Sequence, residues 1–158
     1  MIQNKRSLHL WSTAVVMFSI AVLAHAAGES PVNTDKNGTA VKGYDPVAYF
    51  VQNRPVKGRA EISLSWGGAT WRFASEEHRD LFQSDPERYA PQYGGYCAYA
   101  MASGELADID PSAWKIVQGK LYLNFNRRIQ RRWEKDMPGY IEKADKYWPA
   151  VLKRLKQK

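Results

Sequence analysis

The sequence predicts a small α+β domain, made of two antiparallel β-hairpins, several short helices and a C-terminal helical segment. Apolar and polar residues alternate over 60–66, and this pattern resumes over 69–74 after Gly67-Gly68, a pair typical of a two-residue hairpin turn. A second pair of strands, 114–117 and 120–125, flanks Gln118-Gly119. Strand pairs mixed with short helices, in a chain of this length, indicate one α+β domain.

The first hairpin has one face expected to pack inward. Its members are Ala60, Ile62, Leu64 and Trp66 on the first strand, and Trp71 and Phe73 on the second. In the second hairpin, Leu121, Leu123 and Phe125 share a face, which leaves Tyr122 and Asn124 on the other, either exposed or lining a cleft.

Helix starts are marked by capping residues. Asp45-Pro46 and Asp85-Pro86 each place a capping carboxylate before a proline, Ser75 begins a helix that reaches about Gln83, and Asn126 begins a basic helix. We expect a further helix over 96–102, ended by Gly104. Pro138 opens the last helical stretch, in which Pro149 predicts a kink or interruption. Its expected apolar stripe comprises Ile141, Ala144, Trp148, Leu152 and Leu155.

Residues 1–26 have the pattern of a secretory signal peptide. Lys5 and Arg6 precede an apolar run over 13–24, and Ala24-His25-Ala26 is a cleavage-site pattern. The run is shorter than the roughly 18 residues of a membrane-spanning helix, although an uncleaved anchor is the alternative. We therefore expect a periplasmic or secreted protein with a flexible lead-in over 27–40 and one domain over 41–155.

Positive charge is concentrated at the C-terminal end. The chain carries a net charge of +7, and the segment from Arg127 to Lys158 holds 11 Lys and Arg residues against 4 Asp and Glu residues. Such a segment fits an anionic membrane surface or an acidic protein partner; the alternative is a solvated helical face. Nucleic acid is not expected as a partner of an exported protein.

Sequence motifs for catalysis are absent. The sequence has no GxSxG, HExxH or CxxC motif and no phosphate-binding glycine loop. Past the signal peptide, Cys97 and His78 are the only residues of their types, which excludes zinc sites built from several Cys and His side chains. A single Cys also excludes an internal disulfide.

Cys97 is the main candidate for chemistry. On the expected helix Met101 follows four residues later, so that both sulfur atoms face one side, and a thiolate with a thioether suits a soft ion such as copper(I). His78 is a candidate third ligand, or a base for a thiol-dependent enzyme. The alternative is that Cys97 and Met101 fill the core and His78 has no task.

Three tyrosines surround this cysteine in the sequence. Tyr93, Tyr96 and Tyr99 are candidates for the wall of a small-molecule pocket, although aromatic side chains so close together also pack simply against one another. Asp108 and Asp110 supply too few oxygens for a calcium site, so loop capping is expected there.

Four motifs carry a family resemblance. They are Gly43-Tyr44-Asp45-Pro46-Val47-Ala48-Tyr49-Phe50, Trp71-Arg72-Phe73-Ala74-Ser75, Asp85-Pro86-Glu87-Arg88-Tyr89-Ala90 and Tyr93-Gly94-Gly95-Tyr96-Cys97. Together they resemble exported bacterial YHS-domain proteins, whose superfamily is similar to small treble-clef-like metal domains of copper-transporting ATPases. The resemblance places that superfamily's three metal-binding cysteines at Ala48, Ala74 and His78. It therefore implies a retained scaffold whose usual metal site is lost, because alanine cannot bind a metal.

Two functions remain open from the sequence. One is an exported, non-catalytic binding module that handles a soft metal such as copper through Cys97, with Met101 and His78. The other is a module that binds a small molecule, lipid or protein without a metal, with Cys97 in the core. A thiol-dependent enzyme is the less favoured third hypothesis, because no activating partner for Cys97 is evident.

Overall fold

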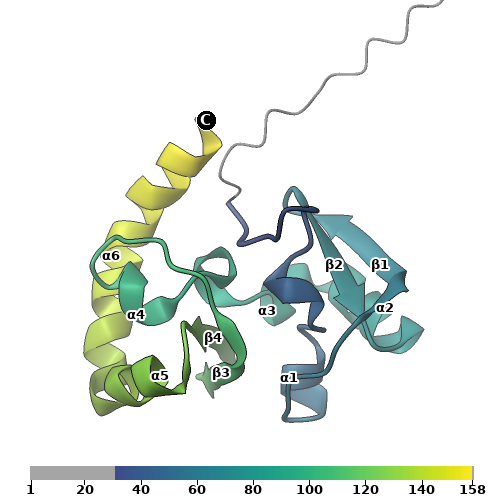
Figure 1. Ribbon diagram of the computed structural model, residues 1–158, viewed down its shortest axis with the longest axis horizontal. Coiled ribbons are helices and arrows are strands. Elements are labelled where there is room, and N and C mark those ends of the chain that lie inside the picture. Colours follow the sequence, from purple (N-terminus) through teal and green to yellow (C-terminus); the bar gives the residue numbers. More distant parts are fainter. Residues whose placement is uncertain (1–30, 158) are drawn as a thin grey trace, which may run out of the picture.

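The computed structural model describes residues 31–157, and it confirms the α+β class with two separate two-stranded antiparallel sheets (Figure 1). The predicted signal peptide at 1–26 lies outside these residues. None of the described helices is both long and apolar enough to cross a bilayer. In chain order the elements are η1 (Val41–Gly43), α1 (Ala48–Val51), β1 (Arg59–Trp66), β2 (Ala69–Phe73), α2 (Glu76–Ser84), α3 (Pro86–Tyr89), η2 (Gln92–Gly95), α4 (Ala98–Met101), β3 (Asp110–Val117), β4 (Lys120–Asn124), α5 (Arg127–Trp133), η3 (Glu134–Asp136) and α6 (Met137–Lys156).

The β1–β2 hairpin forms at the predicted turn. Gly67 and Gly68 have φ angles of 61° and 80°, and Trp66 pairs with Ala69 across them. Both angles are positive, as in the turns that match the twist of a two-residue hairpin. Trp71 and Phe73 are buried as predicted. The prediction that Ala60 packs inward is wrong, because the register shifts between Arg59 and Ser63 and leaves Ala60 exposed.

Strand β4 separates two parts of the core. Leu121 and Leu123 pack with the first hairpin, whereas Tyr122 packs with α6. The strand is therefore buried on both faces. Asn124 is fully buried, whereas Tyr122, although buried, lines a cavity of about 340 Å³ between β4 and α6, so the prediction that this face lines a cleft is confirmed for Tyr122 and wrong for Asn124. The prediction that Phe125 shares the inner face is also wrong: β4 ends at Asn124, and Phe125 is 51% exposed.

The predicted caps at three helix starts are confirmed. The side chains of Ser75, Asp85 and Asn126 accept hydrogen bonds from the backbone N–H groups three residues later. Each cap satisfies a donor that has no partner inside its helix. In contrast, the helix expected over 96–102 shrinks to the single turn of α4, because Cys97 has an extended ψ of 118° and lies before it.

Helix α6 runs along one side of the molecule (Figure 1). Asp136 caps it by accepting a hydrogen bond from Gly139 N, and it continues through Pro149 to Lys156, so the predicted interruption does not occur. Ala144, Val151 and Leu155 are buried against Trp133 and Met101, and Ile141, Trp148 and Leu152 are half-buried. The predicted apolar stripe is thus confirmed, with Val151 added to it.

Residues 31–40, expected to belong to a flexible lead-in, are packed onto the domain. Asn33 N donates to Gly94 O (2.8 Å), and Ala40 N donates to Thr70 O (2.9 Å). Val32 and Ala40 are buried. The described chain therefore begins between the first hairpin and the segment around Gly94.

Candidate functional site

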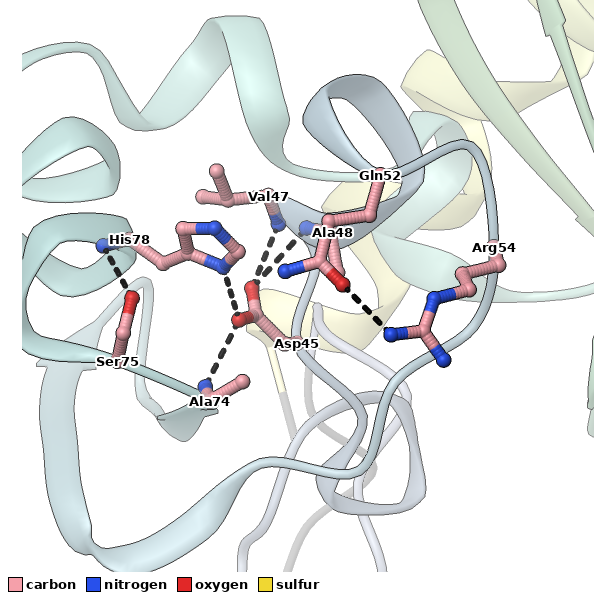
Figure 2. A network of polar contacts seen from close by, with 8 residues as sticks. All are labelled: Asp45, Val47, Ala48, Gln52, Arg54, Ala74, Ser75 and His78. Atoms are coloured by element: carbon pink, nitrogen blue, oxygen red, sulfur yellow. Dashed lines mark hydrogen bonds and ion pairs between the residues drawn. The ribbon is translucent and has the colours of Figure 1, made fainter.

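The three positions that the resemblance aligns with metal-binding cysteines meet at one buried carboxylate (Figure 2). Asp45 Oδ1 accepts hydrogen bonds from Val47 N (2.9 Å) and Ala48 N (3.3 Å). Asp45 Oδ2 accepts from Ala74 N (2.8 Å) and lies 2.6 Å from His78 Nδ1. The Asp45 carboxylate therefore occupies the point around which Ala48, Ala74 and His78 are arranged.

Local structure brings these groups together. Asp45 begins the turn into α1, Ala74 follows the end of β2, and the Ser75 cap fixes the first turn of α2, on which His78 lies. Asp45 is fully buried and His78 is 6% exposed. A carboxylate so placed is stable only when it is fully hydrogen-bonded, and here both oxygens accept two contacts. The pair cross-links α1, β2 and α2.

From the sequence, Asp45 is predicted only to cap a helix. Asp45 Oδ1 accepts from Val47 N and Ala48 N as a capping residue does, but α1 begins at Ala48, so the prediction that Pro46 is its first residue is wrong. The contacts from Asp45 to Ala74 and His78 span 29 and 33 residues. His78 therefore has a partner that no local pattern indicates. Within residues 31–157, no cluster of three or more His, Cys, Asp or Glu side chains is arranged to hold a metal ion.

Cys97 is sealed in the core. Cys97 is 1% exposed. Its Sγ accepts a hydrogen bond from Phe125 N (3.3 Å) and lies 3.8 Å from Asn124 Oδ1. Met101 packs in the other part of the core, beside Trp133 and α6. The helix on which this pairing was predicted does not include Cys97, which lies before α4, and the two side chains belong to different parts of the core.

Thiol chemistry gives a direct test of this placement. We expect native protein to react with a thiol reagent at least about 100-fold more slowly than urea-unfolded protein, because a buried thiol reacts only when the structure opens. The measurement is labelling of Cys97 followed by mass spectrometry, with Cys97→Ser as the blank. Equally fast labelling of native and unfolded protein would contradict the burial, and protection that depends on added copper(I) would support the metal hypothesis.

The three tyrosines do not form one wall. Tyr93 is buried, and its hydroxyl donates to Asp145 Oδ1 of α6 (2.8 Å). Burial, together with this hydrogen bond to a carboxylate, raises the pKa of Tyr93, so it remains a neutral donor. Tyr99 packs on Tyr140, with ring centroids 5.1 Å apart, and Tyr96 packs on the same part of the core. Tyr93 alone reaches the pocket described next.

An apolar pocket of about 520 Å³ lies between the β1–β2 hairpin and the C-terminal half of α6. Trp66 and Trp71 line it from the hairpin, with ring centroids 5.9 Å apart. Tyr93 and Trp148 line it from the other direction, with ring centroids 6.1 Å apart and ring planes inclined at 68°. Trp71 and Tyr93 are buried, whereas Trp66 and Trp148 are half-buried and present ring surface to the pocket.

The pocket has one charge of each sign among its lining residues. Glu87 of α3 and Lys156 of α6 are exposed, and within residues 31–157 neither forms an ion pair. Asp45, His78 and Cys97 do not line this pocket. The buried polar groups that the sequence singled out are therefore separate from the cavity.

Comparison with known families gives one match: the YHS domain model matches residues 47–93, less than a third of the chain. The match begins beside α1 and ends within η2, and it includes the first hairpin. Trp66, Trp71 and Tyr93 lie inside the matched segment, whereas Trp148 and Lys156 of α6 lie outside it. No curated protein and no solved structure matches the chain significantly.

Sequence reasoning missed the pocket. Trp66 was expected on the inner face of a hairpin and Trp148 on the apolar stripe of a helix; both positions are correct. The cavity between them depends on how α6 packs relative to the hairpin, 82 residues away in the chain. The sequence shows both tryptophans on apolar faces, but it gives no signal that the two faces border one cavity.

Proposed function

We propose that this protein is an exported, non-catalytic binding module that holds a small, flat, largely apolar molecule between Trp66 and Trp148. The pocket carries this proposal. Its volume falls in the range of small-molecule sites, which are typically lined by aromatic and aliphatic side chains with a few polar groups. Export is supported by the signal-peptide pattern of residues 1–26.

The chemistry of the lining favours a planar aromatic ligand. The half-buried indoles of Trp66 and Trp148 offer ring faces and edges, against which another ring packs with an additional gain over simple burial. Lys156 supplies a cation for an acidic group on the ligand, and Glu87 accepts from a donor. The position of Asp45, His78 and Cys97 away from the cavity supports binding rather than a reaction.

The YHS match supports a module built on a family scaffold, with its ligand site completed by added structure. Within the matched segment the position of the first hairpin fixes Trp66 and Trp71. Helix α6, outside the match, supplies Trp148, Leu152 and Lys156. On this proposal the side chains of α6 determine which ligand binds, and the hairpin of the YHS-like scaffold forms the opposite wall of the pocket.

A fluorescent aromatic anion tests the proposal. We expect 1-anilinonaphthalene-8-sulfonate to bind at one site per chain. Trp148→Ala should raise the Kd of this probe about 10-fold, because a ring contact is lost. Lys156→Gln should weaken it by about 2- to 5-fold, because an exposed charge contributes little. The measurement is a fluorescence titration of variants whose Tm is unchanged.

The matched control is Tyr147→Ala. Tyr147 is the neighbour of Trp148 on α6, but it does not line the pocket and is 48% exposed. Its removal should leave the Kd of the probe unchanged. If Trp148→Ala and Tyr147→Ala have the same effect, or if the wild-type protein does not bind the probe, the proposed pocket is not the ligand site.

Soft-metal binding through Cys97, Met101 and His78 remains the alternative function. The three donors lie in three settings: Cys97 against β4, Met101 against α6, and His78 beside Asp45. A copper(I) site would require them to move together. We therefore place the ligand site at the pocket, and the copper(I) arm of the thiol-labelling experiment distinguishes the two functions.

A further inference from the structure

Most of the positive charge on the C-terminal helices is not neutralised by ion pairs, because most carboxylates of these helices contact other groups. Residues 127–157 include ten Lys and Arg side chains, all exposed, and of these only Lys146 is ion-paired within the described part of the chain, with Glu142 at 2.6 Å. The other three carboxylates have structural partners. Glu134 contacts Gln130 and Lys115, Asp136 caps α6, and Asp145 accepts from Tyr93.

Four exposed residues of these helices define what we call the basic face: Arg132 of α5 with Lys143, Tyr147 and Arg154 of α6. The short η3 joins the two helices directly. Tyr140 links them. Burial raises the pKa of Tyr140, the nearby Arg132 charge opposes that rise, and the Lys143 ammonium lies 6.0 Å from the Tyr140 ring. Lys143, Tyr147 and Arg154 follow at spacings of four and seven, which place them along one side of a helix.

We propose that the basic face docks on an anionic phospholipid surface. Each Lys or Arg near such a surface adds roughly 1 kcal/mol of attraction, and this attraction is screened by salt. Tyr147 is 48% exposed among these cations, and a tyrosine ring is suited to the headgroup level of a bilayer. The face runs along a 20-residue helix, about 30 Å long, which matches an extended partner. The pocket residue Trp148 is the neighbour of Tyr147, so docking sets the pocket close to the lipid surface.

Vesicle flotation of the full chain, free of its signal peptide if that is cleaved, tests this proposal. We expect binding to vesicles with about 30 mol% phosphatidylglycerol at about 0.05 M NaCl, loss of binding at about 0.5 M, and no binding to pure phosphatidylcholine. Arg132→Glu with Lys143→Glu should weaken partitioning at least about 10-fold. The double variant Lys143→Gln with Arg154→Gln, which removes two positive charges without adding negative ones, should weaken partitioning less. This variant is used if the first one fails to fold.

The matched control reverses the same amount of charge elsewhere. Lys36→Glu with Arg59→Glu changes two exposed cations of the first half of the chain. This pair should retain at least half of the wild-type partitioning. Equal loss in both pairs would show an effect of net charge only and would overturn the assignment of the basic face. Absence of wild-type binding to anionic vesicles, or tighter binding to a DNA duplex or an acidic protein at the same salt, would overturn the lipid proposal.

Discussion

Asp45→Ala is expected to lower the free energy of unfolding by about 3–5 kcal/mol, because each buried donor left without an acceptor costs roughly 1–3 kcal/mol. The substitution removes the acceptor of three backbone N–H groups, on Val47, Ala48 and Ala74, and leaves His78 without its partner. Donors left unsatisfied in a buried position each carry a desolvation penalty. Urea denaturation followed by circular dichroism measures the change.

Two further variants test whether this loss of stability comes from the buried contacts of the Asp45 carboxylate. Asp85→Ala removes an exposed cap of α3 and should cost only about 1 kcal/mol. Asp45→Asn keeps the size of the side chain and one oxygen acceptor, so it should cost less than Asp45→Ala. If Asp45→Ala costs no more than Asp85→Ala, the carboxylate does not hold α1, β2 and α2 together.

Gly94→Ala should be the second most damaging change, with a loss of about 3 kcal/mol or more. Gly94 has a φ angle of 61°, which an alanine adopts only at a cost of roughly 1–2 kcal/mol. In addition, a Cβ at this position would overlap the carbonyl oxygen of Pro31, a backbone atom that cannot rotate away. The contact between Asn33 N and Gly94 O would also be disturbed.

Gly119→Ala separates these two causes. Gly119 has a similar φ angle of 73°, but a Cβ there would meet no atom within 4 Å. Its substitution should therefore cost only the conformational part, about 1–2 kcal/mol. Thermal and urea denaturation of both variants provide the comparison. Equal losses would mean that residues 31–33 do not pack against Gly94 as the structure shows.

Local patterns predicted the secondary structure well. Gly67-Gly68, Ser75, Asp85 and Asn126 each act through atoms within a few residues of themselves, so the sequence contains all that is needed. The errors arise where tertiary packing overrides spacing. Asn124 is buried because Cys97 and the first turn of α4 cover the second face of β4, which no period-two pattern can indicate.

The functional site was less predictable. The sequence pointed to Cys97, His78 and three tyrosines because those residue types carry chemistry, yet Cys97 and His78 are engaged by Phe125 and Asp45 inside the fold. Of the tyrosines, Tyr93 lines the pocket. The pocket itself depends on the packing of α6 against residues far away in the chain, so its composition follows from the tertiary structure alone.

The most direct test of ligand binding between the hairpin and α6 uses the indole N–H signals of the tryptophans in a ¹H–¹⁵N NMR spectrum. A planar aromatic acid should shift the signals of Trp66 and Trp148 in a saturable way, whereas those of Trp114 and Trp133, which do not line the pocket, should stay unchanged. Shifts confined to Trp114 or Trp133, or no saturable shift of Trp66 and Trp148 with any such ligand, would contradict the proposed site.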